Sequence, residues 1–373
     1  MAMAHDDVRI IYGHKVIGTY STNQEENYIN DNRNRRFYLA PGDGFKLSYG
    51  EEFNNFTDRK GESNLVGGRY RWMEDHRQDL IDNQIWDIEQ SRLNVDFVSH
   101  RGVLSSILQM GGKKFLEIDL AVTLYKGTYH LRSKGLGRAD PQAQDIQKIA
   151  ASSKILLQFV TSKDGLNQDE PPPDDHTPGE PAPAKGNEYF YTLMTVNCGN
   201  HRLLLSGDIQ AEKRIAPDEP PPALPDPTNC MNVRSRETHQ DIQPMKALAW
   251  WASNVIAGIP EICCGLRNDK KNTIKKIEPI KTSDLATSGY TENRWDPEVC
   301  IRKMESLLSQ IKELVPEDDP NSIKQAVLII RPVDGGPGVE DRMRNRTFEI
   351  RERLEEDRFV EEHELRCIFE GNE

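Results

Sequence analysis

Two polar residues close the apolar segment LLLSGDIQ, which spans residues 203–210. On a β-strand, residues two apart point to the same face, so Asp208 and Gln210 would project together from one side of a sheet. Metal-dependent nucleases often place two carboxylates in this arrangement, because hard divalent cations prefer oxygen ligands. The second residue here is an amide. The segment is therefore either a damaged metal site or a pair that never bound a metal.

A complete carboxylate pair occurs elsewhere, at Glu117 and Asp119 in the segment FLEIDLAVTL. The same period of two would place both side chains on one strand face. Edge strands often carry such pairs as solvated charge, and the spacing is the only signal for a metal site here. We therefore interpret this pair as strand surface.

Three further segments contain residues that could bind RNA. Arg101 lies where the segment VSHRGVL turns from strand to helix, and its guanidinium offers a fork of donors that matches phosphate oxygens. A surface or salt-bridged arginine is the alternative. Asn232 and Arg234, and Ser253 after a tryptophan pair, read as ordinary packing or surface residues when each is taken singly.

The elements that would position these residues mix strands and helices, which predicts an α+β fold with mixed sheets. Residues 97–110 begin as a strand and continue as an amphipathic helix. Two strands meet at Lys126-Gly127, and a hairpin is expected across Gly199-Asn200. Helices are expected over residues 244–259 and 296–315, the second starting at Asp296-Pro297.

Two acidic, proline-rich segments interrupt this pattern, near residues 166–188 and 216–229. They contain too few apolar side chains to form a packed core, so we expect both to be disordered surface insertions. Both fall inside the mixed series of strands and helices rather than between complete units. A single domain over residues 1–373 is therefore expected.

Composition narrows the classes of partner. The chain has 373 residues, a net charge of −12 and no apolar run of about 18 residues, so neither a membrane span nor a membrane partner is expected. A protein that coats nucleic acid would be basic, so RNA could bind only in a local basic cleft, and protein partners are at least as favoured. None of the six cysteines forms a C-x-x-C pair, which indicates reduced thiols and a cytosolic or nuclear protein.

Several segments, in one order along the chain, resemble the DXO family of RNA 5′-end decapping and exonuclease proteins. The segments that carry the resemblance are VSHRG, YKGTYHL, GNHRLLLSGDIQ, MKALAWWASNVIAGIPEICCGLRN, RWDPEVC and PEDDPNSI. The resemblance implies one α+β body with a restriction-nuclease-like core. It also implies the chemistry of active members, which hold divalent metal with acidic residues from three segments and add a lysine.

The resemblance assigns family positions to individual residues of this chain. The helix glutamate of active members falls on Leu157, or on Leu156 with a shift of one residue. The Gly-Glu-x-Asp motif falls on residues 207–210, where Asp208 keeps an acid and Gln210 does not. The Glu-x-Lys motif falls on Asn232 and Arg234. A glutamine is replaced by Ser253, whereas the phosphate-contacting arginine is kept as Arg101.

These replacements imply a degenerate site with no catalytic residue, no metal and no cofactor. Only Asp208 would supply a carboxylate, and Leu157 would supply no ligand at all. Arg234 would add a positive charge that cannot give up its proton to activate water. We therefore expect a pseudoenzyme rather than an enzyme.

Within the family, dismantled sites occur in a germline branch of fruit flies. That branch acts in the nucleus with Rhino and Deadlock at heterochromatic piRNA source loci, where it shields nascent transcripts from end processing and termination. The resemblance thus implies a nuclear protein whose partner is the Rhino–Deadlock complex. Two alternatives stay open: a pseudoenzyme that still grips RNA 5′ ends, and an active metal-dependent decapping and 5′–3′ exonuclease with displaced ligands.

Overall fold

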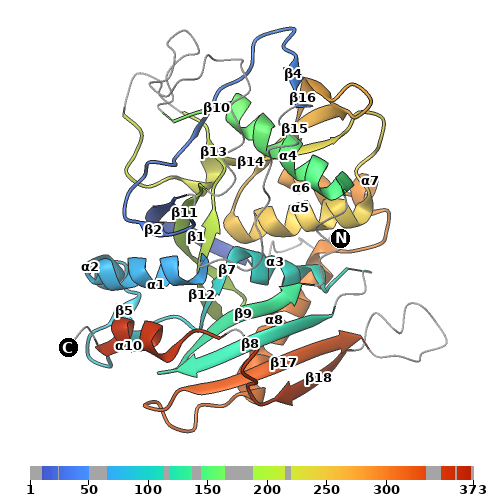
Figure 1. Cartoon of the computed structure of the whole chain (residues 1–373). Coiled ribbons are helices and arrows are strands. Elements are labelled where there is room, and N and C mark those ends of the chain that lie inside the picture. The colour runs from blue at the N-terminus through green and yellow to red at the C-terminus, as the bar shows by residue number, and fades with distance from the viewer. Residues whose placement is uncertain are drawn as a thin grey trace, which may run out of the picture.

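The computed structural model describes residues 11–23, 25–49, 65–112, 117–136, 144–163, 188–214, 220–332, 346–357 and 359–370. These residues form an α+β body in which two mixed sheets are flanked by helices, as the sequence predicts (Figure 1). A short two-stranded hairpin, β5 (Trp86–Asp87) with β6 (Arg92–Leu93), lies apart from both sheets.

Among the described residues the larger sheet has nine strands, and it contains both hairpins predicted from the sequence. Its order is β18 (Arg346–Arg351), β17 (Lys324–Pro332), β8 (Ile118–Tyr125), β9 (Thr128–Leu136), β7 (Phe97–His100), β12 (His201–Asp208), β11 (Phe190–Cys198), β1 (Ile11–Thr22) and β2 (Tyr28–Ile29). The turn between β8 and β9 uses positive φ at Lys126 (46°) and Gly127 (77°), the geometry that tight hairpins require.

The smaller sheet has seven strands in the part of the chain that the structure describes, and the chain enters it directly from the larger sheet. Its order is β10 (Thr161–Ser162), β3 (Phe37–Tyr38), β13 (Ala211–Glu212), β14 (Cys230–Glu237), β15 (Glu261–Asn268), β16 (Thr273–Lys281) and β4 (Leu47–Ser48). Strand β12 of the larger sheet ends at Asp208, and β13 of the smaller sheet begins at Ala211. Asp208 and Gln210 therefore lie at the junction of the two sheets.

Helices pack against both sheets. They are α1 (Leu65–Asp75), α2 (Arg77–Asp82), α3 (Arg101–Gln109), α4 (Gln144–Phe159), α5 (Pro244–Ala257), α6 (Thr282–Leu285), α7 (Ser288–Thr291), α8 (Pro297–Leu314) and α10 (Glu362–Glu370). Apolar residues of α3, α5 and α8 share one core with the larger sheet, and those of α1, α2 and α10 share a core on its other face. Figure 1 shows α1, α2 and α10 close together on one side of the molecule.

Local signals at the helix ends explain where two helices begin. Asp296 caps α8 by accepting a hydrogen bond from the Val299 N–H at 2.9 Å, and Pro297 occupies the first helical position. Pro244 begins α5 in the same way. No helix in the described ranges is long and apolar enough to cross a membrane.

The two proline-rich insertions have different outcomes. Residues 166–187 of the first lie outside the described residues. In the second, residues 220–229 have a defined conformation that ends in a 3₁₀ turn, η2 (Pro227–Asn229), so the prediction of disorder is wrong for this part. Arg35 holds it by donating to the Pro222 carbonyl at 2.6 Å, and the rings of Pro225 and Pro227 are buried. Proline rings add apolar surface that can be buried, and a count of the usual apolar side chains leaves this surface out.

Candidate functional site

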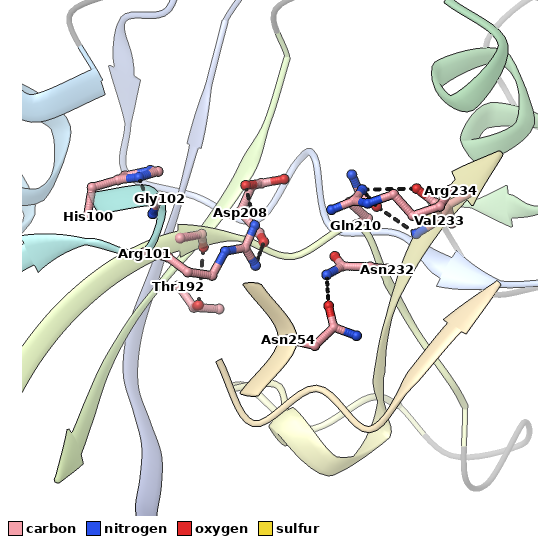
Figure 2. Close-up of polar contacts among 11 residues, drawn as sticks. His100, Arg101, Gly102, Thr192, Asp208, Gln210, Asn232, Val233, Arg234 and Asn254 are labelled. Carbon is pink, nitrogen blue, oxygen red and sulfur yellow. Dashed lines mark hydrogen bonds and ion pairs between the residues drawn. The ribbon is translucent and has the colours of Figure 1, made fainter. Parts of the chain in front are cut away.

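Asp208 and Arg101 contact each other at the junction of the sheets. Arg101 begins α3, whose first turn is capped by His100, which accepts a hydrogen bond from the Gly102 N–H at 3.0 Å. The Arg101 guanidinium donates to the Asp208 carbonyl and to Oδ1 of the Asp208 carboxylate, each at 2.7 Å (Figure 2). Both side chains are largely buried, so the carboxylate lies in a salt bridge rather than in open solvent.

A glycine permits this approach. A Cβ atom added at Gly207 would lie 2.9 Å from Cβ of Arg101 and 3.2 Å from its Nε. Such distances are too short for ordinary contacts, so a side chain at Gly207 would force Arg101 or the backbone beside it to shift. The first glycine of the motif thus has a packing reason here that is independent of metal binding.

Gln210 connects the junction to the neighbouring strand β14. Its Oε1 accepts hydrogen bonds from the Val233 N–H at 2.6 Å and from Nη1 of Arg234 at 3.1 Å (Figure 2). The same Nη1 also donates to the Val233 carbonyl at 3.0 Å. The amide oxygen is therefore already occupied by two protein donors.

Asn232 is fully buried and begins a chain of side-chain hydrogen bonds. Its Nδ2 donates to Oδ1 of Asn254 at 2.5 Å, and Nδ2 of Asn254 donates to Oγ1 of Thr282 at 2.8 Å. Thr282 in turn donates to the Ile259 carbonyl at 2.7 Å. This chain ties β14 to α5 and to the first turn of α6, and Figure 2 shows its first bond.

The charge balance at the junction is positive. Burial is the main cause that lowers the pKa of Arg234 to about 10, with Asp208 opposing that shift and Arg101 adding to it. Arg234 therefore stays protonated at neutral pH, so two guanidinium groups act on one carboxylate. Burial likewise lowers the pKa of Lys246, on the first turn of α5, and the charges of Arg267, Arg236 and Arg234 contribute to that shift.

Two of the predicted site residues do not join this cluster. Leu157 is 8% exposed and packs with Met231 and Val233, on the face of β14 opposite to Asn232 and Arg234. Ser253 is half-buried on α5, but it is the next residue, Asn254, that contacts Asn232. A buried asparagine within the apolar stretch WWASNVIA was the available signal for Asn254, and the sequence argument missed it.

The second carboxylate pair is strand surface, as interpreted. Glu117 forms a salt bridge with Arg331 at 2.8 Å, and both side chains are about half exposed. Asp119 lies opposite Ile329 of β17 and is partly exposed. In the described part of the chain, no group of three or more His, Cys, Asp or Glu residues is placed to hold a metal ion.

Comparison with known proteins assigns the family. The model of the RAI1-like PD-(D/E)XK nucleases matches residues 14–332. The chain belongs to this family. The resemblance to decapping nucleases read from the sequence is thereby confirmed.

Relatives of this RAI1-like chain are distant but cover most of it. The decapping and exoribonuclease protein of Xenopus laevis is 26% identical over 316 residues, which is 82% of this chain and 77% of the relative. The decapping and exoribonuclease protein Rai1 of Drosophila melanogaster is 22% identical over 275 residues, 69% of this chain and 68% of the relative. The crystal structure of Scheffersomyces stipitis Rai1 in complex with (3'-NADP)+ and calcium ion aligns with a TM-score of 0.68 at 15% identity, covering 95% of this chain and 90% of that one.

The divalent cation that PD-(D/E)XK chemistry implies does not fit the residues of this RAI1-like chain. Such a cation is held by one or two carboxylates together with other oxygen ligands that are free to turn toward it. Asp208 is engaged by Arg101, the oxygen of Gln210 is engaged by Val233 and Arg234, and Leu157 faces away. A cation would also meet the fixed charges of both arginines at short range.

Proposed function

We propose that this chain is a non-catalytic member of its family. The observation that carries the proposal is the salt bridge between Asp208 and Arg101, because it neutralises the one acid kept at the motif. The lysine position holds Arg234, which stays protonated and cannot accept a proton from water. Loss of a single well-placed transition-state donor costs a factor of about 10²–10³ in rate, and here several ligands are replaced together.

The proposal extends to the biological role implied by the resemblance. Replaced acids and two proline-rich insertions make the chain similar to Cutoff, the germline relative in fruit flies. On this proposal the chain acts in the nucleus as a subunit of the Rhino–Deadlock complex at heterochromatic piRNA loci. There it would protect nascent transcripts from 5′-end processing and termination. A net charge of −12 supports a protein partner over a general nucleic-acid coat.

A second role at the same site is RNA 5′-end binding without cleavage. The observation in its favour is the group of cations around the junction, Arg101, Arg234 and Lys246, which outnumber the nearby carboxylate Asp208. Guanidinium groups suit phosphate oxygens. This role predicts that 5′-monophosphate RNA binds and that Arg234→Ala weakens the binding.

One assay separates these roles from an active nuclease. The full chain is incubated with 5′-monophosphate RNA and with capped RNA in manganese, and both binding and product release are measured. A variant with Gln210→Asp, Asn232→Glu and Arg234→Lys runs beside it. Leu157 is left unchanged because a glutamate there would be buried on the wrong face.

We expect no release of mono- or dinucleotides by the wild-type chain, and manganese binding only in the restored variant. Manganese-dependent turnover by the wild-type chain that disappears in Asp208→Ala would show an active enzyme with displaced ligands. The partner is tested separately by mixing the purified chain with purified Rhino and Deadlock. Failure to co-elute would contradict the complex without restoring an enzymatic role.

A further inference from the structure

The guanidinium of Arg101 already holds an oxyanion, and that oxyanion belongs to its own chain. Nη1 donates to the main-chain carbonyl of Asp208 and Nη2 donates to Oδ1 of the Asp208 carboxylate, each at 2.7 Å (Figure 2). Guanidinium N–H groups that meet two oxygens in this way are also how arginine binds a phosphate group. The Asp208 carboxylate therefore occupies a donor that a bound phosphate would need.

Packing fixes the direction of the Arg101 side chain. The side chain is 7% exposed, and its stem lies against the backbone of Gly207, where an added Cβ atom would come within 3.2 Å of both Cδ and Nε of Arg101. The guanidinium cannot turn toward another anion without moving this packed stem. A ligand for Arg101 must therefore take the place where the Asp208 carboxylate now lies.

The carboxylate is the more accessible member of the pair. The side chain of Asp208 is 19% exposed, against 7% for Arg101. A change of rotamer at Asp208 would release Nη2 of Arg101, but the bond from Nη1 to the main-chain carbonyl would remain. The carboxylate can therefore leave while the arginine stays oriented for a second anion.

The charge at the junction favours a doubly charged ligand. Arg101 and Arg234 both act on the carboxylate of Asp208, which carries a single negative charge. A terminal phosphate group carries about −1.5 to −2 charges at pH 7, whereas a phosphodiester carries a single charge, as the carboxylate does. A terminal phosphate therefore balances the two guanidinium groups better than a phosphodiester does. The displaced carboxylate stays nearby and repels the phosphate, which lowers the affinity of the wild-type chain.

We propose that Asp208 is an internal competitor for a terminal phosphate, so that the junction binds RNA 5′-phosphate ends only when the carboxylate leaves Nη2 of Arg101. The inference rests on the RNA 5′-end role proposed above and adds an autoinhibitory contact to it. Only the molecules in which the carboxylate is displaced can bind, and the apparent dissociation constant rises by the inverse of their fraction. Removing the carboxylate should therefore tighten binding, although it removes a stabilising salt bridge.

Fluorescence anisotropy of the full chain tests the proposal. The probes are a short 3′-labelled RNA with a 5′-monophosphate and the same RNA with a 5′-hydroxyl, without divalent metal, and inorganic phosphate is titrated separately by calorimetry. The variants are Asp208→Ala, which clears the place beside Arg101, and Asp208→Asn, which keeps the side-chain volume. The matched control is Asp119→Asn, the same change in net charge on a partly exposed strand residue. Arg101→Gln is added to Asp208→Ala, and circular dichroism verifies that each variant is folded.

We expect Asp208→Ala to bind the 5′-monophosphate RNA at least tenfold more tightly than the wild-type chain, with a smaller gain in Asp208→Asn and none in Asp119→Asn. The gain should be absent with the 5′-hydroxyl RNA and should be cancelled by Arg101→Gln.

The internal competition is overturned if both Asp208 variants bind the 5′-monophosphate RNA no more tightly than wild type, even where the RNA role itself survives. It is also overturned if the 5′-hydroxyl RNA gains equally, or if no variant binds any of the three probes. A gain for inorganic phosphate in Asp208→Ala without RNA binding supports the internal competition and contradicts the RNA role.

Discussion

Replacing Asp208 by asparagine separates a structural counter-ion from a metal ligand. In a working metal site, clustered carboxylates repel each other when the metal is absent, so neutralising one of them stabilises the metal-free protein. Here Asp208 lies against Arg101 and acts on Arg234. Removing its charge leaves two guanidinium groups uncompensated. The two explanations therefore predict opposite signs for the change in unfolding free energy.

The geometry of the salt bridge sets the size of the expected change in unfolding free energy. The carboxylate accepts from Nη2 of Arg101 at 2.7 Å, and the Asp208 side chain is 19% exposed. A hydrogen bond between charged groups in such a setting contributes about 1.5–3 kcal/mol. Asparagine keeps one oxygen and the bond to the main-chain carbonyl, so we expect Asp208→Asn to lower the unfolding free energy by about 1.5–3 kcal/mol.

Urea unfolding followed by circular dichroism measures the change, with and without manganese. The matched control is Asp119→Asn, the same substitution on a partly exposed strand residue, and it should stay within about 0.5 kcal/mol of wild type. Manganese should leave the unfolding midpoints unchanged. The reasoning is refuted if Asp208→Asn stabilises the chain, or if manganese stabilises the wild-type chain and not this variant.

Three further predictions concern the same body of the protein. Asn254→Ala removes the acceptor for Asn232 and should lower the unfolding free energy by about 1–3 kcal/mol in urea, whereas no loss would show that the buried chain of hydrogen bonds is dispensable. Gly207→Ala forces a Cβ against Arg101 and should cost about 1–3 kcal/mol, with a loss under 0.5 kcal/mol contradicting the close approach. Burial, aided by the charge of Arg69, lowers the pKa of His130 to about 3 from the ordinary 6.5. Because the unfolded chain takes up this proton first, stability should fall between pH 6.5 and 3, by about 2 kcal/mol at pH 5. His130→Gln should remove that part of the slope, and an unchanged slope would contradict it.

Local sequence signals predict most of the elements of the fold. The turn at Lys126-Gly127, the proline and aspartate at the start of α8 and the period-two strands are all encoded within a few residues, so their geometry follows from short-range chemistry. The ordered segment 220–229 escaped prediction because its order depends on Arg35, a residue nearly 200 positions away in the chain. Composition cannot report such a contact.

Strand residues of the candidate site were easier to place from the sequence than helix residues, for a geometric reason. Asp208, Gln210, Asn232 and Arg234 lie on or beside strands, where two-residue spacing fixes the face. Leu157 lies on a helix, where each step turns the side chain by about 100°, so a small error in the assigned position moves the residue to another face. Its true neighbours, Met231 and Val233, are apolar. Asn254 could be found only through its long-range contact with Asn232.

The side chains at the junction connect neighbouring elements of the fold. Asp208 joins the end of β12 to α3, Gln210 joins the junction to β14, and Asn232 joins β14 to α5. An acid restored at Gln210 would still accept from the Val233 N–H but would add a charge, whereas a longer acid at Asn232 would break a buried bond. Acidic side chains at these positions and the hydrogen bonds observed at the junction are therefore competing demands.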